Sequence, residues 1–306
     1  MRQAPIEQVS LEDVQTFIGE RKGIVIDTLV QEHYEARHIP EAVNACVYEI
    51  IFVSSVAEVA PDKEKPVLLY GAGPQSLDSI TAAEKLQREG YTDVSVFFGG
   101  LEEWREAGLP LEGQATGEVA LPHPHLVLSD RRYTLLPEES TCIWVGRSST
   151  VRHHGTIGFA DGYLDAQGDL SARFTLDMTS IQSINLEGDA LKPVLEMHLM
   201  SDDFFFTAMF PTATFETTAI KVVKDGEASR PNGMMQGLLS LRGMSQDIAF
   251  PVHIRNLEDD RIVVIGDLDF DRTQWGVIYG SSRFFAHLGY HSVYDFVSVD
   301  YRLVFA

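Results

Sequence analysis

The strongest constraint on the fold is an alternation of apolar and polar residues in the second half of the chain. In residues 173–180, Phe174, Leu176 and Met178 fall on one side of an extended strand and polar residues fall on the other. Residues 248–254 and 297–305 repeat the pattern. A period of two, without long helices between the segments, is typical of antiparallel strands with one buried face.

Turn-forming residues separate these segments, as at Asp161-Gly162 and Gln167-Gly168-Asp169. Gly, Asp and Asn adopt the backbone angles that tight turns need. About eight strands joined by such turns close most easily into a barrel, whose interior is filled by side chains or holds one small ligand. The second half is therefore predicted to be an all-β antiparallel barrel.

The first third of the chain has a different pattern. Residues 23–27, 66–70 and 94–98 are short apolar runs, and residues with helical spacing lie between them. Ser10, with Asp13 three residues later, forms a capping box that predicts the start of a helix. Strands that alternate with helices predict an α/β domain with a parallel sheet.

Several motifs of this first domain resemble the rhodanese-like family. They are Asp27, His38-Ile39-Pro40-Glu41-Ala42, Phe98-Gly99-Gly100-Leu101 and Ala107-Gly108-Leu109-Pro110, so the resemblance covers roughly residues 6 to 112. It implies a loop after the strand at 66–70 in which a cysteine becomes a persulfide, supported by arginine side chains.

The corresponding loop, residues 71–79, contains neither cysteine nor arginine. It carries Gly71, Gly73, Ser76 and Ser79 instead. A serine hydroxyl cannot carry a sulfane sulfur as a thiolate does, so we expect a rhodanese-like fold without sulfurtransferase activity and predict no catalytic residue. Three roles stay open for this loop: holding a small anion, docking a protein partner, or serving as a turn without function.

The second half resembles the YceI-like family. The resemblance spans roughly residues 128 to 306 and includes residues 271–276. Its most specific parts are Asp202-Asp203-Phe204-Phe205, Phe210-Pro211-Thr212-Ala213-Thr214-Phe215 and residues 237–243. It implies a lipocalin-like barrel that holds a long apolar molecule, such as a polyisoprenoid, a quinone, or a fatty amide or acid.

The expected ligand-binding residues are apolar side chains on the inner faces of the strands or in the aromatic stretch 201–218. They are Phe159, Phe174, Leu176, Met178, Phe205, Met209, Phe210, Phe215, Met235, Leu239, Leu241 and Trp275. Two alternatives remain: a scaffold whose barrel is filled by these same side chains, and an enzyme, either a sulfurtransferase or a redox enzyme acting on a bound quinone.

The amino-acid composition limits the classes of partner that the protein is expected to bind. Lys and Arg total 24 against 45 Asp and Glu, which gives the net charge of −21 and disfavours nucleic acid and anionic membranes. Cys46 and Cys142 have no metal-like spacing, and His153, His154, His287 and His291 share no carboxylate at ligand spacing, so no metal or cofactor is expected.

No segment has the length of a signal peptide or a membrane span, so we expect a cytoplasmic protein. The predicted domains are residues 1–113 and 128–306, with a linker at 114–127. A protein partner for the first domain is left open.

Overall fold

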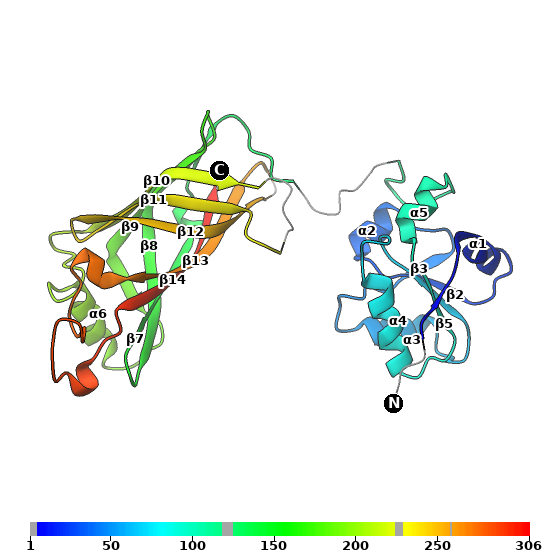
Figure 1. Ribbon diagram of the computed structural model, residues 1–306, viewed down its shortest axis with the longest axis horizontal. Coiled ribbons are helices and arrows are strands. Elements are labelled where there is room, and N and C mark those ends of the chain that lie inside the picture. Colours follow the sequence, from blue (N-terminus) through cyan, green and yellow to red (C-terminus); the bar gives the residue numbers. More distant parts are fainter. Residues whose placement is uncertain (1–4, 118–124, 224–228, 258) are drawn as a thin grey trace. The chain divides into compact units, whose positions relative to one another are not determined.

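A computed structural model describes residues 5–117, 125–223, 229–257 and 259–306. The chain divides into two compact units, one within residues 1–120 and the other within 121–306 (Figure 1). The predicted domain limits at 113 and 128 stay predictions, since part of the expected linker lies outside the described residues. No helix in the described ranges is long and apolar enough to cross a membrane.

The first unit is an α/β fold with a parallel sheet, which confirms the predicted class. Its elements are β1 (Glu7–Gln8), α1 (Leu11–Gly19), β2 (Ile24–Asp27), α2 (Gln31–Ala36), β3 (Ala42–Asn44), α3 (Phe52–Val59), β4 (Val67–Tyr70), α4 (Asp78–Arg88), β5 (Val94–Phe97) and α5 (Gly100–Glu106). The strand order is β1-β5-β4-β2-β3, and every pairing is parallel.

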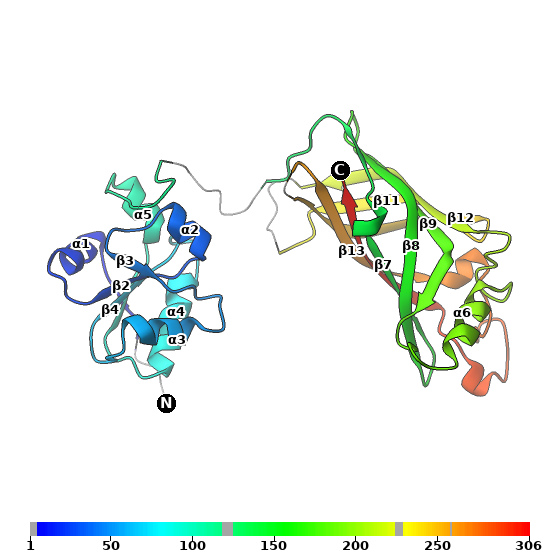
Figure 2. The ribbon, with the colours of Figure 1, turned by 180° about the vertical axis from the view of Figure 1, so that it is seen from behind.

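Helices cover both faces of this sheet (Figure 2). α3 and α4 pack on one face through Phe52, Val56 and Leu86, while α1 and α5 pack on the other through Val14 and Trp104. Burial on both faces explains why the central strands read as unbroken apolar runs. α1 begins at the predicted cap, where the Ser10 amide donates to Asp13 Oδ2 at 2.9 Å.

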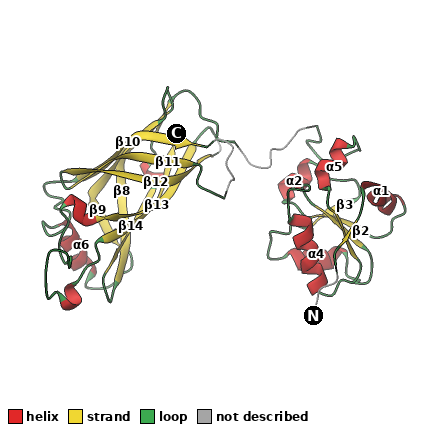
Figure 3. Ribbon diagram, viewed as in Figure 1, coloured by secondary structure: helices red, strands yellow, loops and turns green. Residues whose placement is uncertain are grey.

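The second unit is a closed antiparallel barrel, as the alternation predicts (Figure 3). Its elements are β6 (Arg132–Thr134), η1 (Pro137–Glu139), β7 (Thr141–Arg147), β8 (Arg152–Asp165), β9 (Ser171–Ser183), α6 (Lys192–Met200), β10 (Thr212–Val222), β11 (Gly233–Leu241), β12 (Met244–Asn256), β13 (Ile262–Asp271), η2 (Arg272–Trp275), η3 (Gly289–His291) and β14 (Phe296–Phe305).

Eight strands, β7 to β14, form the barrel wall. Each pairs with the next along the chain, and β14 pairs with β7 to close the ring. The short β6 adds to the end of β8. Since all eight pairings are antiparallel, each strand presents alternate side chains to the interior.

One predicted turn is wrong. Asp161 and Gly162 lie inside β8, where the pairing with β9 shifts register between Phe159 and Asp161. Glycine is needed here because a Cβ on Gly162 would lie 2.9 Å from the carbonyl oxygen of Arg173. The extra residue of this β-bulge is Ala160, directly before the Asp-Gly pair, and the bulge bends the long strand.

Candidate functional site

A cavity of about 380 Å³ occupies the interior of the barrel. Its walls are inward-facing side chains of the barrel strands, and α6 and the loop before β14 complete it at one end. Eight of the twelve predicted ligand-binding residues line it: Phe159, Phe174, Leu176, Met178, Phe205, Phe215, Leu239 and Leu241. These residues come from β8, β9, β10, β11 and the segment after α6.

An arc of aromatic rings forms much of the wall. Phe159 meets Phe174 edge-on with centroids 6.4 Å apart, and Phe174 lies 5.2 Å from Phe215. The arc continues to Phe250 at 5.1 Å and from there to Tyr301 at 5.9 Å. Tilted and edge-on pairs at these separations are favourable ring contacts. The rings therefore brace one another and keep the wall rigid and apolar.

The other four predicted residues do not line the cavity. Met209 is exposed, and Phe210 packs against Phe206 in the turn after α6. Met235 and Trp275 are fully buried in the surrounding core, where Trp275 Nε1 donates to the carbonyl oxygen of Leu239 at 2.8 Å. Trp275 thus supports a cavity-lining strand from behind.

Further lining residues were missed by the sequence interpretation. They include Trp144, Ile157, Ile181, Leu195, Leu199, Phe204, Ile248, Phe250, Leu268, Phe270 and Tyr279. Alternation in β12 and β13 could have identified Ile248, Phe250, Leu268 and Phe270. The contributions of α6 and of the loop before β14 had no comparable signal, because their side-chain directions depend on tertiary packing.

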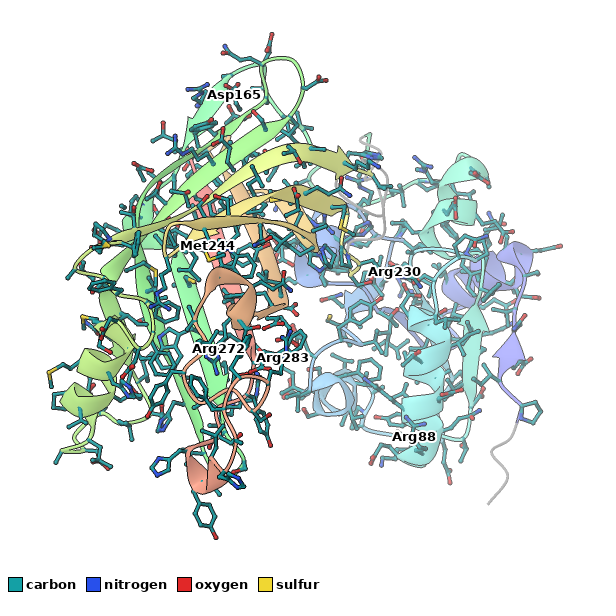
Figure 4. All side chains as sticks on the ribbon, turned by 60° about the vertical axis from the view of Figure 1, so that its left-hand side comes forward. Arg88, Asp165, Arg230, Met244, Arg272 and Arg283 are labelled. Carbon is teal, nitrogen blue, oxygen red and sulfur yellow. The ribbon has the colours of Figure 1, made fainter. Side chains whose placement is uncertain are left out.

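Arg272 organises the end of the barrel where that loop lies (Figure 4). Its guanidinium is buried and donates four hydrogen bonds to backbone carbonyl oxygens. The acceptors are Val277 (2.5 Å), Tyr279 (2.8 Å), Val293 (3.1 Å) and Tyr294 (3.1 Å). Burial lowers the pKa of Arg272, but an arginine side chain remains charged in proteins. The Arg272 guanidinium therefore stabilises the loop, and its hydrogen bonds are made to the protein itself without a ligand.

His198 is the polar group of α6 at the cavity wall. Its ring packs edge-on between Phe204, at 4.9 Å, and Tyr279, at 4.7 Å. Its Nε2 lies 3.2 Å from a carboxylate oxygen of Asp203. Aromatic packing and a carboxylate partner hold this imidazole as part of the wall.

The deep end of the cavity holds a thiol and a phenol. Cys142 and Tyr301 are register partners on β7 and β14, and Leu303 and Phe305 are fully buried further along β14. Tyr301 lies over Gly266, where a Cβ would be 2.4 Å from its hydroxyl oxygen. Burial raises the pKa of Cys142 to about 12. The thiol is thus protonated at neutral pH and is a poor nucleophile.

In the first unit, an internal carboxylate fills the degenerate loop. The buried Asp78 accepts hydrogen bonds from the amides of Ala72 (3.0 Å) and Ser79 (2.7 Å) and from the Ser76 hydroxyl (2.8 Å). A Cβ on Gly71 would lie 1.8 Å from Asp78 Oδ1. The carboxylate stands where an added anion would have to bind, which argues against the anion-holding role.

The surroundings of this loop also lack room for a thiolate. A Cβ on Gly73 would lie 2.5 Å from a Glu102 carboxylate oxygen. Asp27, at the end of β2, is buried and accepts a hydrogen bond from the Leu29 amide at 2.8 Å. Burial raises the pKa of Asp27 to about 6. The carboxylates of Asp78 and Glu102 thus lie directly against the loop, where a persulfide would need cations, and His33 is close enough to Asp78 to interact with it.

Metal coordination finds no support in the described ranges. No group of three or more His, Cys, Asp or Glu side chains there could hold a metal ion.

Comparisons with known proteins divide the chain in the same way. The family model of the YceI-like domain matches residues 133–305, and that of the rhodanese-like domain matches residues 10–107. Among curated proteins, the thiosulfate sulfurtransferase GlpE of Coxiella burnetii is 29% identical over 99 residues, which cover 32% of this chain and 87% of GlpE.

Two solved structures resemble the second unit. BcnA of Burkholderia cenocepacia is 20% identical with a TM-score of 0.44, over 56% of this chain and 98% of BcnA. A polyisoprenoid binding domain from Saccharophagus degradans is 18% identical with a TM-score of 0.43, over 56% of this chain and 97% of that domain.

Proposed function

Because the chain belongs to the YceI-like family, we propose that its barrel binds and carries one long apolar molecule, such as a polyisoprenoid, a quinone, or a fatty amide or acid. The observation that carries the proposal is the aromatic-walled cavity of about 380 Å³. Its size lies in the range of small-molecule sites, which are concave and mostly apolar. An unfilled space of this kind also argues against a scaffold with a filled barrel.

Recognition in this cavity rests on burial and shape rather than on charge. Each buried CH₂ group contributes about 0.8 kcal/mol, so a chain of ten carbons contributes about 8 kcal/mol against the cost of binding, and a longer chain contributes more. The four Arg272 hydrogen bonds go to backbone carbonyls, and His198 faces Asp203. Arg272 is therefore engaged by the protein itself, and Arg147 of the same wall donates to the Ser298 hydroxyl at 2.8 Å.

For the rhodanese-like unit we propose an interaction role instead of sulfur transfer. Tyr48, Ile50, Ile51 and Leu77 are all exposed, and Ile50 is fully so. Leu77 belongs to the degenerate loop, and Tyr48 lies close enough to Ser76 of the same loop to interact with it. Exposed apolar groups that gather in one place indicate a surface for a partner.

The binding proposal is tested by mass spectrometry of the organic extract from natively purified protein. Two neighbouring leucines of β11 offer a matched pair, because Leu239 lines the cavity and is 8% exposed, whereas Leu238 points outward and is 41% exposed. Leu239→Glu should abolish co-purified lipid, since a carboxylate must lose its hydration or become neutral inside the cavity. Leu238→Glu should leave the lipid unchanged.

A circular-dichroism melt must show that both variants are folded. Lipid retained equally by folded Leu239→Glu, or wild-type protein that yields no lipid, would overturn the binding proposal. For the first unit, turnover in a thiosulfate:cyanide assay above a no-enzyme blank would restore the sulfurtransferase alternative.

A further inference from the structure

The outer face of α6 is apolar, and its polar residues turn toward the protein. Leu191, at the helix N-cap, Val194 and Met197 follow one another at three-residue spacing and are 60%, 54% and 66% exposed. Glu196 accepts a hydrogen bond from the Ser183 amide at 2.8 Å, and Lys192 pairs with Glu187 and Glu196. A surface helix normally buries its apolar face and exposes its polar residues. This inversion marks the outer face of α6 as a contact surface.

The same surface borders the cavity. α6 and the loop before β14 lie at one end of the barrel in both views (Figures 1 and 2). Tyr290 and Tyr294 of that loop line the cavity and are nevertheless 84% and 50% exposed. We call Leu191, Val194, Met197, Tyr290 and Tyr294 the apolar rim. The rim thus combines two tyrosines of the cavity wall with the outer face of a helix whose Leu195 and Leu199 line the cavity.

We propose that the apolar rim docks on the surface of a neutral or zwitterionic lipid bilayer, where the barrel takes up or releases its ligand. This inference rests on the proposed function. A long apolar molecule is hardly soluble in water, so it resides in membranes, and a carrier must reach it there without exposing it to solvent.

The chemistry of the rim fits a bilayer interface. Tyrosine rings, which combine an apolar body with a polar tip, are enriched at the depth of lipid head groups. An exposed apolar helix face binds such an interface by burying its area among the acyl chains. These two features occur together around the cavity.

The charge of the protein indicates which partner the apolar rim contacts: a second copy of the chain, an anionic bilayer or a neutral bilayer. The net charge of −21 repels a second copy of the chain and also repels anionic lipid. Asp202 and Asp203 follow α6 directly, so the repulsion acts close to the rim. A neutral or zwitterionic surface removes this cost while offering the same apolar contact.

Vesicle flotation tests the inference with full-length protein and phosphatidylcholine vesicles. Wild type should float with the vesicles, and Val194→Gln/Met197→Gln should lose flotation. Glutamine keeps the helix propensity of these positions. The matched control is Val127→Gln/Val223→Gln, because both valines are 63% exposed and belong to the opposite end of the barrel, beside the ends of β12 and β10. The control should float as wild type does.

Mass spectrometry of the same samples separates this inference from the proposed function. If lipid co-purifies but wild type does not float, or if the α6 variant floats equally well, bilayer docking is refuted while ligand binding stands. Equal loss in the control variant would also refute it, as would stronger flotation with phosphatidylserine vesicles. If the rim captures a protein and no vesicles, the occupant is that partner and the bilayer proposal fails.

Discussion

Replacing Arg272 with methionine tests whether this buried cation holds the loop of residues 277–294 in place. Methionine keeps much of the apolar stem but leaves four carbonyl oxygens, one buried and three part-buried, without this donor. Removing one partner of such a buried charged network costs about 3 to 5 kcal/mol. For a unit of this size each kcal/mol shifts the melting temperature by about 2 to 4 °C, so we expect a fall of about 6 to 20 °C.

Calorimetry of the full chain measures this fall, and hydrogen exchange should show the largest loss of protection in residues 277–294. Arg283→Met is the control, because Arg283 is exposed and its pair with Asp271, at 2.8 Å, should contribute no more than about 1 kcal/mol. If Arg272→Met and Arg283→Met have the same melting temperature, or if that of Arg272→Met lies within about 2 °C of the wild-type value, the four hydrogen bonds do not hold the loop.

Three further predictions concern charge. Burial raises the pKa of Asp27 from 3.8 to about 6. The contribution of Asp27 to the stability of the first unit is therefore complete below pH 3.8 and is lost as the pH rises through about 6, by about 3 kcal/mol in all. Denaturant titrations across this range should show the loss in wild type and not in Asp27→Asn. Gly71→Cys should gain no thiosulfate:cyanide activity and should melt earlier, because its Cβ meets Asp78; Gly71→Cys/Asp78→Ala, which removes this clash, should also show no activity. At moderate salt the protein should pass through a DNA column, and retention that weakens steeply with added salt would contradict this.

The sequence predicted the strand interiors well because alternation is a local property of an extended chain. In β11, Met235, Leu239 and Leu241 are buried and Leu238 is exposed, as the period of two requires. The same logic does not distinguish a side chain that lines a cavity from one that fills the core beneath it. Met235 and Leu239 share a face, yet only Leu239 reaches the cavity.

The aromatic stretch after α6 shows where local pattern fails. Phe204 and Phe205 line the cavity, whereas Met209 is exposed and Phe210 packs locally. The segment is a series of turns, in which Phe206 has a positive φ of 49°. Side-chain directions in such turns follow individual backbone angles and not a period. Likewise, α6 gave no sequence signal, since its apolar residues face both the cavity and the solvent.

The closure of the barrel between β7 and β14 has a consequence for synthesis. These strands are the first and the last of the barrel wall, so nearly the whole second unit lies between the residues that pair. The first unit can fold while the ribosome is still translating the second, since domains fold from the N-terminus as units. The cavity cannot form until β14 has emerged, and pairings between such distant segments are slow. Until then the inner faces of the other strands are open to aggregation, and the ligand can enter only a finished barrel.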